Sequence, residues 1–205
     1  MTALPVSLLI VAAILIVFPL QGLLPMDELI LVSSEVVQRP WTLLTHMFLH
    51  GSLQHLVGNA FAFGLFGFIL ERVIGTRNFI WVFLIGGLVS SVGDIMFYSA
   101  TLGISGALFG LIGALAVLRP RVGVLAFGVP LPMIVAAGLW ILIDLSGFPY
   151  PDGIAHAAHL FGVGAGIVLG FYFRKYFPLP KEPKEPSPIS EQEHRDWEEE
   201  YMLSR

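Results

Sequence analysis

A few uncharged polar side chains could support nucleophilic catalysis in an otherwise apolar sequence. Ser105 and His159 each stand near the start of an apolar stretch, and a third stretch begins with His55 and Asn59. A serine hydroxyl is a weak nucleophile at neutral pH, but an imidazole within hydrogen-bonding reach can accept its proton during attack on a carbonyl carbon. His55 and Asn59 are four residues apart. They therefore share one helix face, from which both can donate N–H groups to an oxyanion.

Glycine spacing indicates how Ser105 and His159 could meet. Glycines follow each of them at intervals of three or four residues, so each set forms one stripe along a helix. Such stripes allow two helix backbones to approach closely, as a hydrogen bond between Ser105 and His159 requires. The glycines are Gly106, Gly110 and Gly113 in the first stretch, and Gly162 and Gly166 in the second.

The composition predicts that these stretches belong to a membrane domain. Of the 205 residues, 56% are hydrophobic, and the mean hydropathy is +0.80. Residues 1–173 contain only 12 charged side chains, whereas residues 174–205 contain 14. We therefore expect a membrane domain over residues 1–175 and a flexible polar tail over 176–205, favoured over a short tail helix capped by Ser190 and Glu193. A net charge of −4 disfavours nucleic-acid binding, and the absence of cysteine excludes a thiol nucleophile.

Six apolar stretches predict an all-α bundle of six membrane-spanning helices. Their approximate ranges are 6–24, 53–70, 78–98, 105–118, 125–145 and 154–173. The fourth is shorter than the roughly 20 residues that usually cross a bilayer, so neighbours must shield it or the bilayer must be thin there. The segment from 25 to 50 mixes charged and apolar residues, and Trp41 is a candidate interfacial anchor. We expect this first outer loop to lie in the membrane interface.

The distribution of basic residues predicts the orientation. Six spans place both termini on one side, together with eight Lys and Arg residues near the spans, against Arg39 alone on the other side. Basic residues flank cytoplasmic ends, so both termini are predicted to be cytoplasmic in a cell membrane. Ser105, His159, His55 and Asn59 then lie within roughly 10 Å of the outer ends of their helices. The eight are Arg72, Arg77, Arg119, Arg121, Arg174, Lys175, Lys181 and Lys184.

Three segments together resemble one family. RPWTLLTHMFLHGSLQHLVGN, GISGALFG and AHAAHLFGVGAG are similar to segments of the rhomboid intramembrane serine proteases, in order and over nearly all of residues 1–175. The resemblance implies a six-helix rhomboid-like bundle that cleaves transmembrane-protein substrates within the lipid bilayer. It implies a serine–histidine dyad without a carboxylate, a metal or a cofactor.

The resemblance also implies a role for each matching residue. Ser105 would be the nucleophile and His159 the base. The oxyanion hole would consist of His55, Asn59 and the backbone N–H of Ser105. The supporting residues would be Gly103 in the turn before the nucleophile, Gly106, the structural loop histidine His50, Gly162 and Gly166.

Some residues depart from the family pattern or stand beside it. Thr42 follows Trp41, where the family commonly has arginine, so the loop contacts of that arginine are in question. His156 lies one turn closer to the surface than His159, and we expect it to be solvated or in contact with a loop. For Asp94 and Asp144 we favour interfacial capping or helix–helix bonding over membership of a catalytic triad.

Three alternative functions stay open at this point. A catalytically inactive relative acting as a membrane chaperone or binding module usually lacks the serine or the histidine, and both are present here. Two histidine pairs, His46 with His50 and His156 with His159, have spacings that could bind a metal, but no carboxylate motif accompanies them. A transporter would place its polar residues near the midplane rather than near one face.

Overall fold

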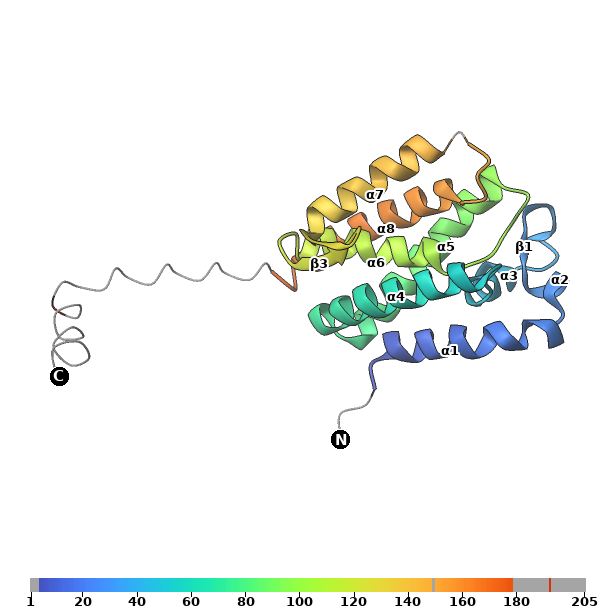
Figure 1. The fold of residues 1–205 in the computed structure, drawn as a ribbon, viewed down its shortest axis with the longest axis horizontal. Helices are drawn as coiled ribbons and strands as arrows, with labels where there is room; N and C mark the ends of the chain where they lie inside the picture. Colours follow the sequence, from blue (N-terminus) through green and yellow to red (C-terminus); the bar gives the residue numbers. More distant parts are fainter. Residues whose placement is uncertain (1–3, 149, 179–191, 193–205) are drawn as a thin grey trace.

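The structure is a computed structural model that describes residues 4–148, 150–178 and 192. Over these residues the chain is mostly helical, with two short antiparallel strand pairs (Figure 1). Most of the tail predicted over 176–205, including the positions Ser190 and Glu193 of the alternative capped helix, lies outside the described residues. The elements are α1 (Val6–Leu20), η1 (Gln21–Leu23), α2 (Met26–Leu29), β1 (Leu31–Val32), η2 (Ser33–Glu35), α3 (Thr42–Thr45), η3 (His46–Phe48), α4 (Leu53–Ile74), α5 (Thr76–Phe97), β2 (Ala100–Thr101), α6 (Ser105–Leu118), β3 (Gly123–Ala126), β4 (Val129–Pro132), α7 (Met133–Gly147) and α8 (His156–Arg174).

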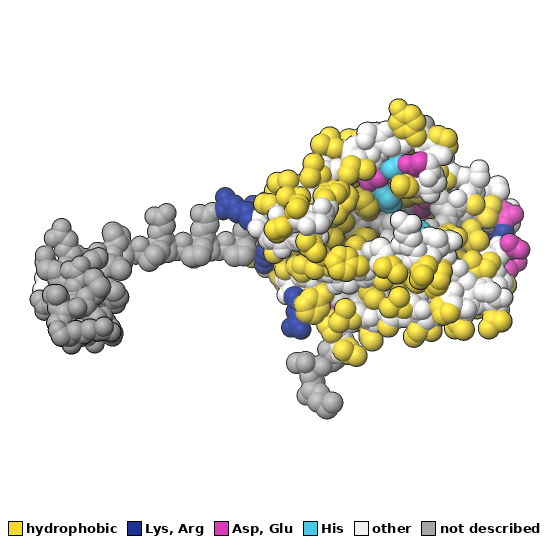
Figure 2. Space-filling view, in the orientation of Figure 1, with side chains coloured by type: hydrophobic (Ala, Val, Ile, Leu, Met, Phe, Trp, Pro, Cys, Tyr) yellow, Lys and Arg dark blue, Asp and Glu magenta, His cyan; other side chains and the backbone are white. Residues whose placement is uncertain are grey.

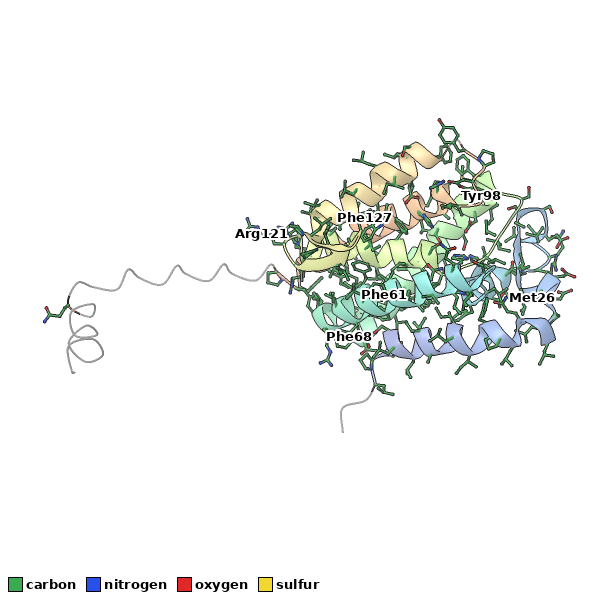
Figure 3. All side chains as sticks on the ribbon, in the orientation of Figure 1. Met26, Phe61, Phe68, Tyr98, Arg121 and Phe127 are labelled. Atoms are coloured by element: carbon green, nitrogen blue, oxygen red, sulfur yellow. The ribbon has the colours of Figure 1, made fainter. Side chains whose placement is uncertain are left out.

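Four of the described helices are long and apolar enough to cross a membrane. They are α1 continued by η1, α4, α5 and α8. Apolar side chains such as Phe61 and Phe68 project outward from α4, as they would toward lipid (Figure 3). The two shorter apolar helices are α6 with 14 residues and α7 with 15. The mostly helical bundle agrees with the predicted fold class, while the number of six spans stays a prediction.

The short helix α6 lies at the centre of the bundle. Every residue from Gly106 to Leu118 is buried, and α4, α5, α7 and α8 pack around the helix (Figure 1). Its 14 residues span about 21 Å, less than the roughly 30 Å of a hydrocarbon core. Of the two explanations predicted for a short fourth helix, the structure shows shielding by neighbours.

Glycines bring α6 and α8 into direct backbone contact. A Cβ atom on Gly162 would lie 2.1 Å from the carbonyl oxygen of Gly106, and one on Gly166 would lie 2.0 Å from that of Gly110. On the other face of α6, a Cβ on Gly86 of α5 would lie 3.2 Å from the Cα of Gly110. The predicted stripes therefore do form the helix contacts, because a side chain at either α8 position would overlap the backbone of α6.

The start of the fifth stretch was predicted wrongly. Residues 125–132, expected to open a helix, instead belong to a hairpin in which Leu125 pairs with Pro130 and Gly123 with Pro132. The turn has positive φ at both Phe127 and Gly128, the pattern of a type I′ turn. Prolines lack the N–H that a helix interior needs, so α7 begins only after Pro132.

The outer segment between α1 and α4 is a compact set of short elements. Its strand β1 pairs with β2, which joins this segment to the connection that leads into α6. Trp41 is 47% exposed and donates its indole N–H to the carbonyl of Glu28. Arg39 bonds the carbonyl of Asp27 and pairs with Glu35, while Thr42 is buried. Position 42, where the family commonly has arginine, is Thr42 in this chain. Arg39 nevertheless makes contacts within the same loop.

Charged side chains separate toward opposite ends of the bundle. Figure 2 shows Lys and Arg side chains at the end where α8 leads into the C-terminal residues, and a group of acidic side chains at the other end. Arg121 lies at the first of these ends and Met26 at the second (Figure 3). The charge asymmetry that predicts the orientation is therefore present in three dimensions.

Candidate active site

A cavity of about 1300 Å³ opens beside the first turns of α4, α6 and α8. Its walls include Ser105, His159, His55 and Asn59, together with Phe109. Three helices thus bring all four polar residues predicted from the sequence to one cavity.

Ser105 is the first residue of α6. Backbone N–H groups in a first turn have no partner within the helix, so the N–H of Ser105 can serve a ligand. Gly103, two residues earlier, has a φ of +123° and donates its N–H to the carbonyl of His46 at 2.9 Å. A Cβ atom on Gly103 would lie 2.7 Å from the His55 ring, so only glycine fits this turn without displacing His55.

His159 lies within hydrogen-bonding distance of the serine. Its Nε2 is 2.9 Å from the Oγ of Ser105, a distance at which the hydroxyl can donate to the ring. The His159 ring stacks on Phe109, with centroids 4.2 Å apart and planes inclined by 4°. The sequence analysis missed Phe109, although it stands four residues after Ser105 and therefore on the same face of α6.

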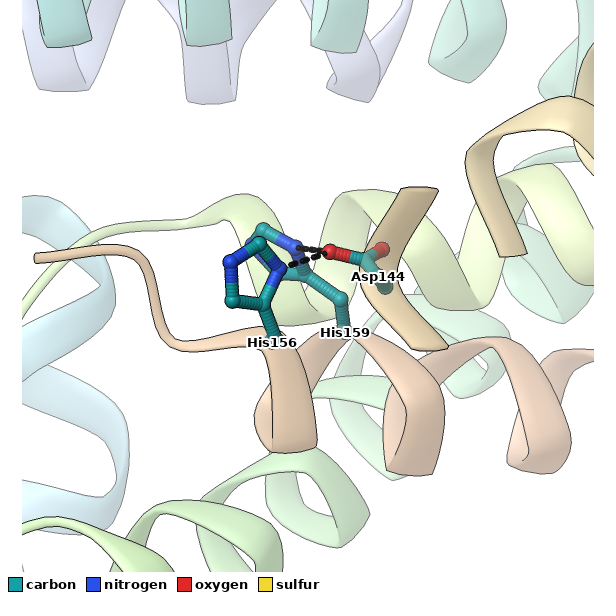
Figure 4. A group of neighbouring side chains, drawn as sticks. All are labelled: Asp144, His156 and His159. Atoms are coloured by element: carbon teal, nitrogen blue, oxygen red, sulfur yellow. Dashed lines mark hydrogen bonds and ion pairs between the residues drawn. The ribbon is translucent and has the colours of Figure 1, made fainter. Parts of the chain in front are cut away.

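The other nitrogen of His159 faces a carboxylate from α7. Nδ1 lies 2.9 Å from Oδ1 of Asp144, and the same oxygen lies 2.7 Å from Nδ1 of His156 (Figure 4). His156 also places Nε2 at 3.1 Å from Oδ2 of Asp152 in the preceding loop. His156 is only 3% exposed, so the expectation that it is solvated was wrong, while the alternative of a loop contact holds. Asp144 makes the helix–helix bonds that we favoured for it.

Hydrogen bonds hold the α4 side of the cavity in place. The Nδ2 of Asn59 lies 3.1 Å from Nε2 of His50, and Gln21 exchanges two hydrogen bonds with the backbone of His50. Burial, with a further contribution from neighbouring His55, lowers the pKa of His50 to about 4. His50 is therefore neutral at neutral pH and can accept a hydrogen bond from Asn59, which fixes the orientation of that amide.

The histidines do not assemble as the metal alternative requires. His46 directs Nδ1 to the carbonyl of Thr42 and Nε2 toward Asp94, 3.8 Å away, rather than toward His156. Within the described residues, a group of possible metal ligands does occur at Asp144, His156 and His159. Its two Nδ1···Oδ1 distances, 2.7 and 2.9 Å, are those of hydrogen bonds. Ligands at about 2.1 Å from a tetrahedral zinc would lie roughly 3.4 Å apart.

The described helices are apolar, and they surround a cavity that contains a hydrogen-bonded serine and histidine. These features are those of a helical membrane protein with a candidate nucleophilic site. The family model described as the Rhomboid domain matches residues 37–176, which is more than half of the chain. The chain therefore belongs to the rhomboid family.

Two similar proteins illustrate the relationship. "Rhomboid protein 1, mitochondrial" of Saccharomyces cerevisiae is 27% identical over 165 residues, which cover 73% of this chain and 46% of that protein. "Rhomboid protease GlpG" of Yersinia pestis is 27% identical over 144 residues, which cover 68% of this chain and 50% of that protein. The chain thus spans about half the length of the curated relatives it matches.

Proposed function

We propose that this protein is an intramembrane serine endopeptidase that hydrolyses peptide bonds of transmembrane-protein substrates near the outer face of the membrane. The observation that carries the proposal is the 2.9 Å contact between Ser105 Oγ and His159 Nε2 inside a cavity. Membership of the rhomboid family and similarity to a protein named a rhomboid protease support it.

In the proposed reaction, Ser105 Oγ attacks the carbonyl carbon of the scissile bond while its proton passes to Nε2 of His159. The intermediate then collapses, and His159 returns that proton to the leaving nitrogen. A water molecule then attacks the acyl-enzyme, with His159 again accepting the proton. The proton returns to Ser105 Oγ as the substrate fragment leaves with its new carboxylic acid. N–H groups of His55, Asn59 and the Ser105 backbone would stabilise the oxyanion, where loss of one donor typically costs about 10²–10³ in turnover.

We also propose the membrane arrangement that this chemistry requires. Residues 1–175 would form a six-span domain with an interfacial first outer loop, and residues 176–205 a cytoplasmic tail. Both termini would face the cytoplasm of a cell membrane, since the Lys and Arg side chains near the spans lie predominantly at that end. The cavity opens at the opposite end, from which water can enter.

A catalytically inactive relative that binds membrane proteins without cleaving them is the alternative. The test is cleavage of a single-span model substrate by the full chain in lipid vesicles, with Ser105→Ala as the diagnostic variant. Ser146→Ala is a matched control, because Ser146 is on α7 and only bonds the carbonyl of Ile143 on its own helix.

The proposal expects cleavage by the unmodified chain and by Ser146→Ala, with none by Ser105→Ala or His159→Gln. Retention of full cleavage by Ser105→Ala would show that the nucleophile is misassigned. Binding of the substrate with no cleavage by any form would favour the inactive relative. Loss of cleavage on adding a chelator would favour the metal alternative instead.

A further inference from the structure

We infer that Asp144 is a positioning residue for His159, so that the site works as a serine–histidine–aspartate arrangement rather than as a dyad. The inference rests on the proposed function. The observation behind it is the chain of contacts from Ser105 Oγ through His159 to Asp144 Oδ1, with successive distances of 2.9 and 2.9 Å.

Hydrogen-bond donors and acceptors determine the tautomer of His159. A carboxylate oxygen only accepts, so Nδ1 of His159 must carry the proton that it donates to Asp144. In the neutral ring Nε2 is then unprotonated, and it is the atom that faces the hydroxyl of Ser105. Asp144 therefore holds the base in the tautomer that can accept the serine proton, and its charge stabilises the imidazolium that forms.

His156 supplies the charge that compensates Asp144 in its buried position. Asp144 is only 3% exposed, and an isolated buried carboxylate would be costly. His156 lies between Asp144 and Asp152, and a ring that donates to two carboxylates must have both nitrogens protonated. The N–H of Ile154, with His156, holds the pKa of Asp152 below its usual range, so this partner is an ionised acceptor. His156 is thus the cation that compensates Asp144.

Other side chains near His159 lie outside this chain of hydrogen bonds. His55 on α4 lines the same cavity as His159. Tyr98, which directly follows α5, accepts the N–H of Ala157 with its hydroxyl oxygen, and α6 contributes no ionisable side chain.

The chain offers a matched pair of substitutions. Asp144→Asn removes the charge next to His159, whereas Asp152→Asn makes the same change at a carboxylate that bonds His156 and the N–H of Ile154 rather than His159. Initial rates on the single-span substrate give kcat and KM, and thermal unfolding reports the folded fraction of each variant. Asp144→Glu restores the charge, and Ser105→Ala tests the proposed function in parallel.

We expect Asp144→Asn to lower kcat by at least about 100-fold with little change in KM, because the base loses its orientation rather than the substrate its binding site. Asp144→Glu should recover part of this loss, and Asp152→Asn should retain most of the activity. Reaction of Ser105 with a fluorophosphonate should slow in parallel in Asp144→Asn, since that reaction needs the activated serine but no docked substrate.

The inference has clear contrary outcomes. If Asp144→Asn cleaves within about threefold of the unmodified chain while Ser105→Ala is inactive, Asp144 has no such role and the proposed function stands. An equal loss in Asp152→Asn would likewise overturn it. If Ser105→Ala stays active, the proposed function itself fails. Should Asp144→Asn not fold, nitrogen-15 spectra of the unmodified chain decide, since an Nε2-protonated neutral His159 contradicts the inference.

Discussion

Replacing Gly162 by alanine should separate the two catalytic helices. A Cβ atom at this position would lie 2.1 Å from the carbonyl oxygen of Gly106, and real Cβ atoms essentially never approach within 3.0 Å. The atom in the way belongs to the backbone of the buried helix α6, which no side-chain rotation can move. The two helices must therefore shift apart locally by about 0.9 Å.

The size of this shift decides the effect on catalysis. Ser105 immediately precedes Gly106, and His159 stands one turn before Gly162, so a shift here reaches both. If it adds to the 2.9 Å between Oγ and Nε2, the contact approaches about 3.8 Å and is no longer a hydrogen bond. A misplacement near 1 Å can cost about 100-fold in rate. Overpacking typically costs about 1–3 kcal/mol of stability, offset by about 1 kcal/mol from the better helix propensity of alanine.

Gly164→Ala is the matched control on the same helix. Gly164 is exposed and nothing lies within 4 Å of its Cβ position, so this change should slightly raise stability and leave the rate unchanged. Cleavage rates on the single-span substrate, corrected for the folded fraction, compare the two variants. Equal rates for Gly162→Ala and Gly164→Ala would refute the argument that backbone contact between α6 and α8 sets the Ser–His distance.

Three further predictions follow from the same structure. His55→Ala should lower kcat by about 10²–10³-fold with KM little changed, as measured by initial rates; a change in KM alone would contradict an oxyanion role. Burial lowers the pKa values of His46 and His50 to about 4, so the unfolded chain binds more protons than the folded one below about pH 6.5. The unfolding temperature should therefore fall as the pH drops from about 6.5 to about 4, and a flat profile would count against this. Because the chain has no cysteine, Pro151→Cys should react with an impermeant maleimide on intact cells and Gly123→Cys only after permeabilisation, and the opposite pattern would reverse the proposed orientation.

The sequence was sufficient to predict the parts of the site that depend on spacing within a helix. His55 and Asn59 share a face of α4 because they are four residues apart, and the glycine intervals fixed which faces of α6 and α8 meet. Phe109 was accessible to the same reasoning and was overlooked, because a phenylalanine in an apolar stretch is ordinarily read as core.

Asp144 could not be assigned in the same way. It stands 15 residues before His159, on a different helix, and the intervening loop determines whether the two meet. Nothing in the local pattern fixes the path of such a loop. The hairpin before α7 was missed for a related reason, since residues 125–129 are apolar enough to resemble the start of a span. Pro130 and Pro132 were visible, but their significance depends on where the helix begins.

The packing of α7 links Asp144 to the way the bundle is held together. The buried residues of this helix are Met133, Ala136, Ala137 and Asp144, and the first three lie in its first half. The second half exposes apolar residues such as Leu142 and Leu145. In this half, Asp144 attaches α7 to α8 through hydrogen bonds with His156 and His159. Any displacement of this end of α7 from α8 must break these bonds, and would release His159 from its partner at the same moment.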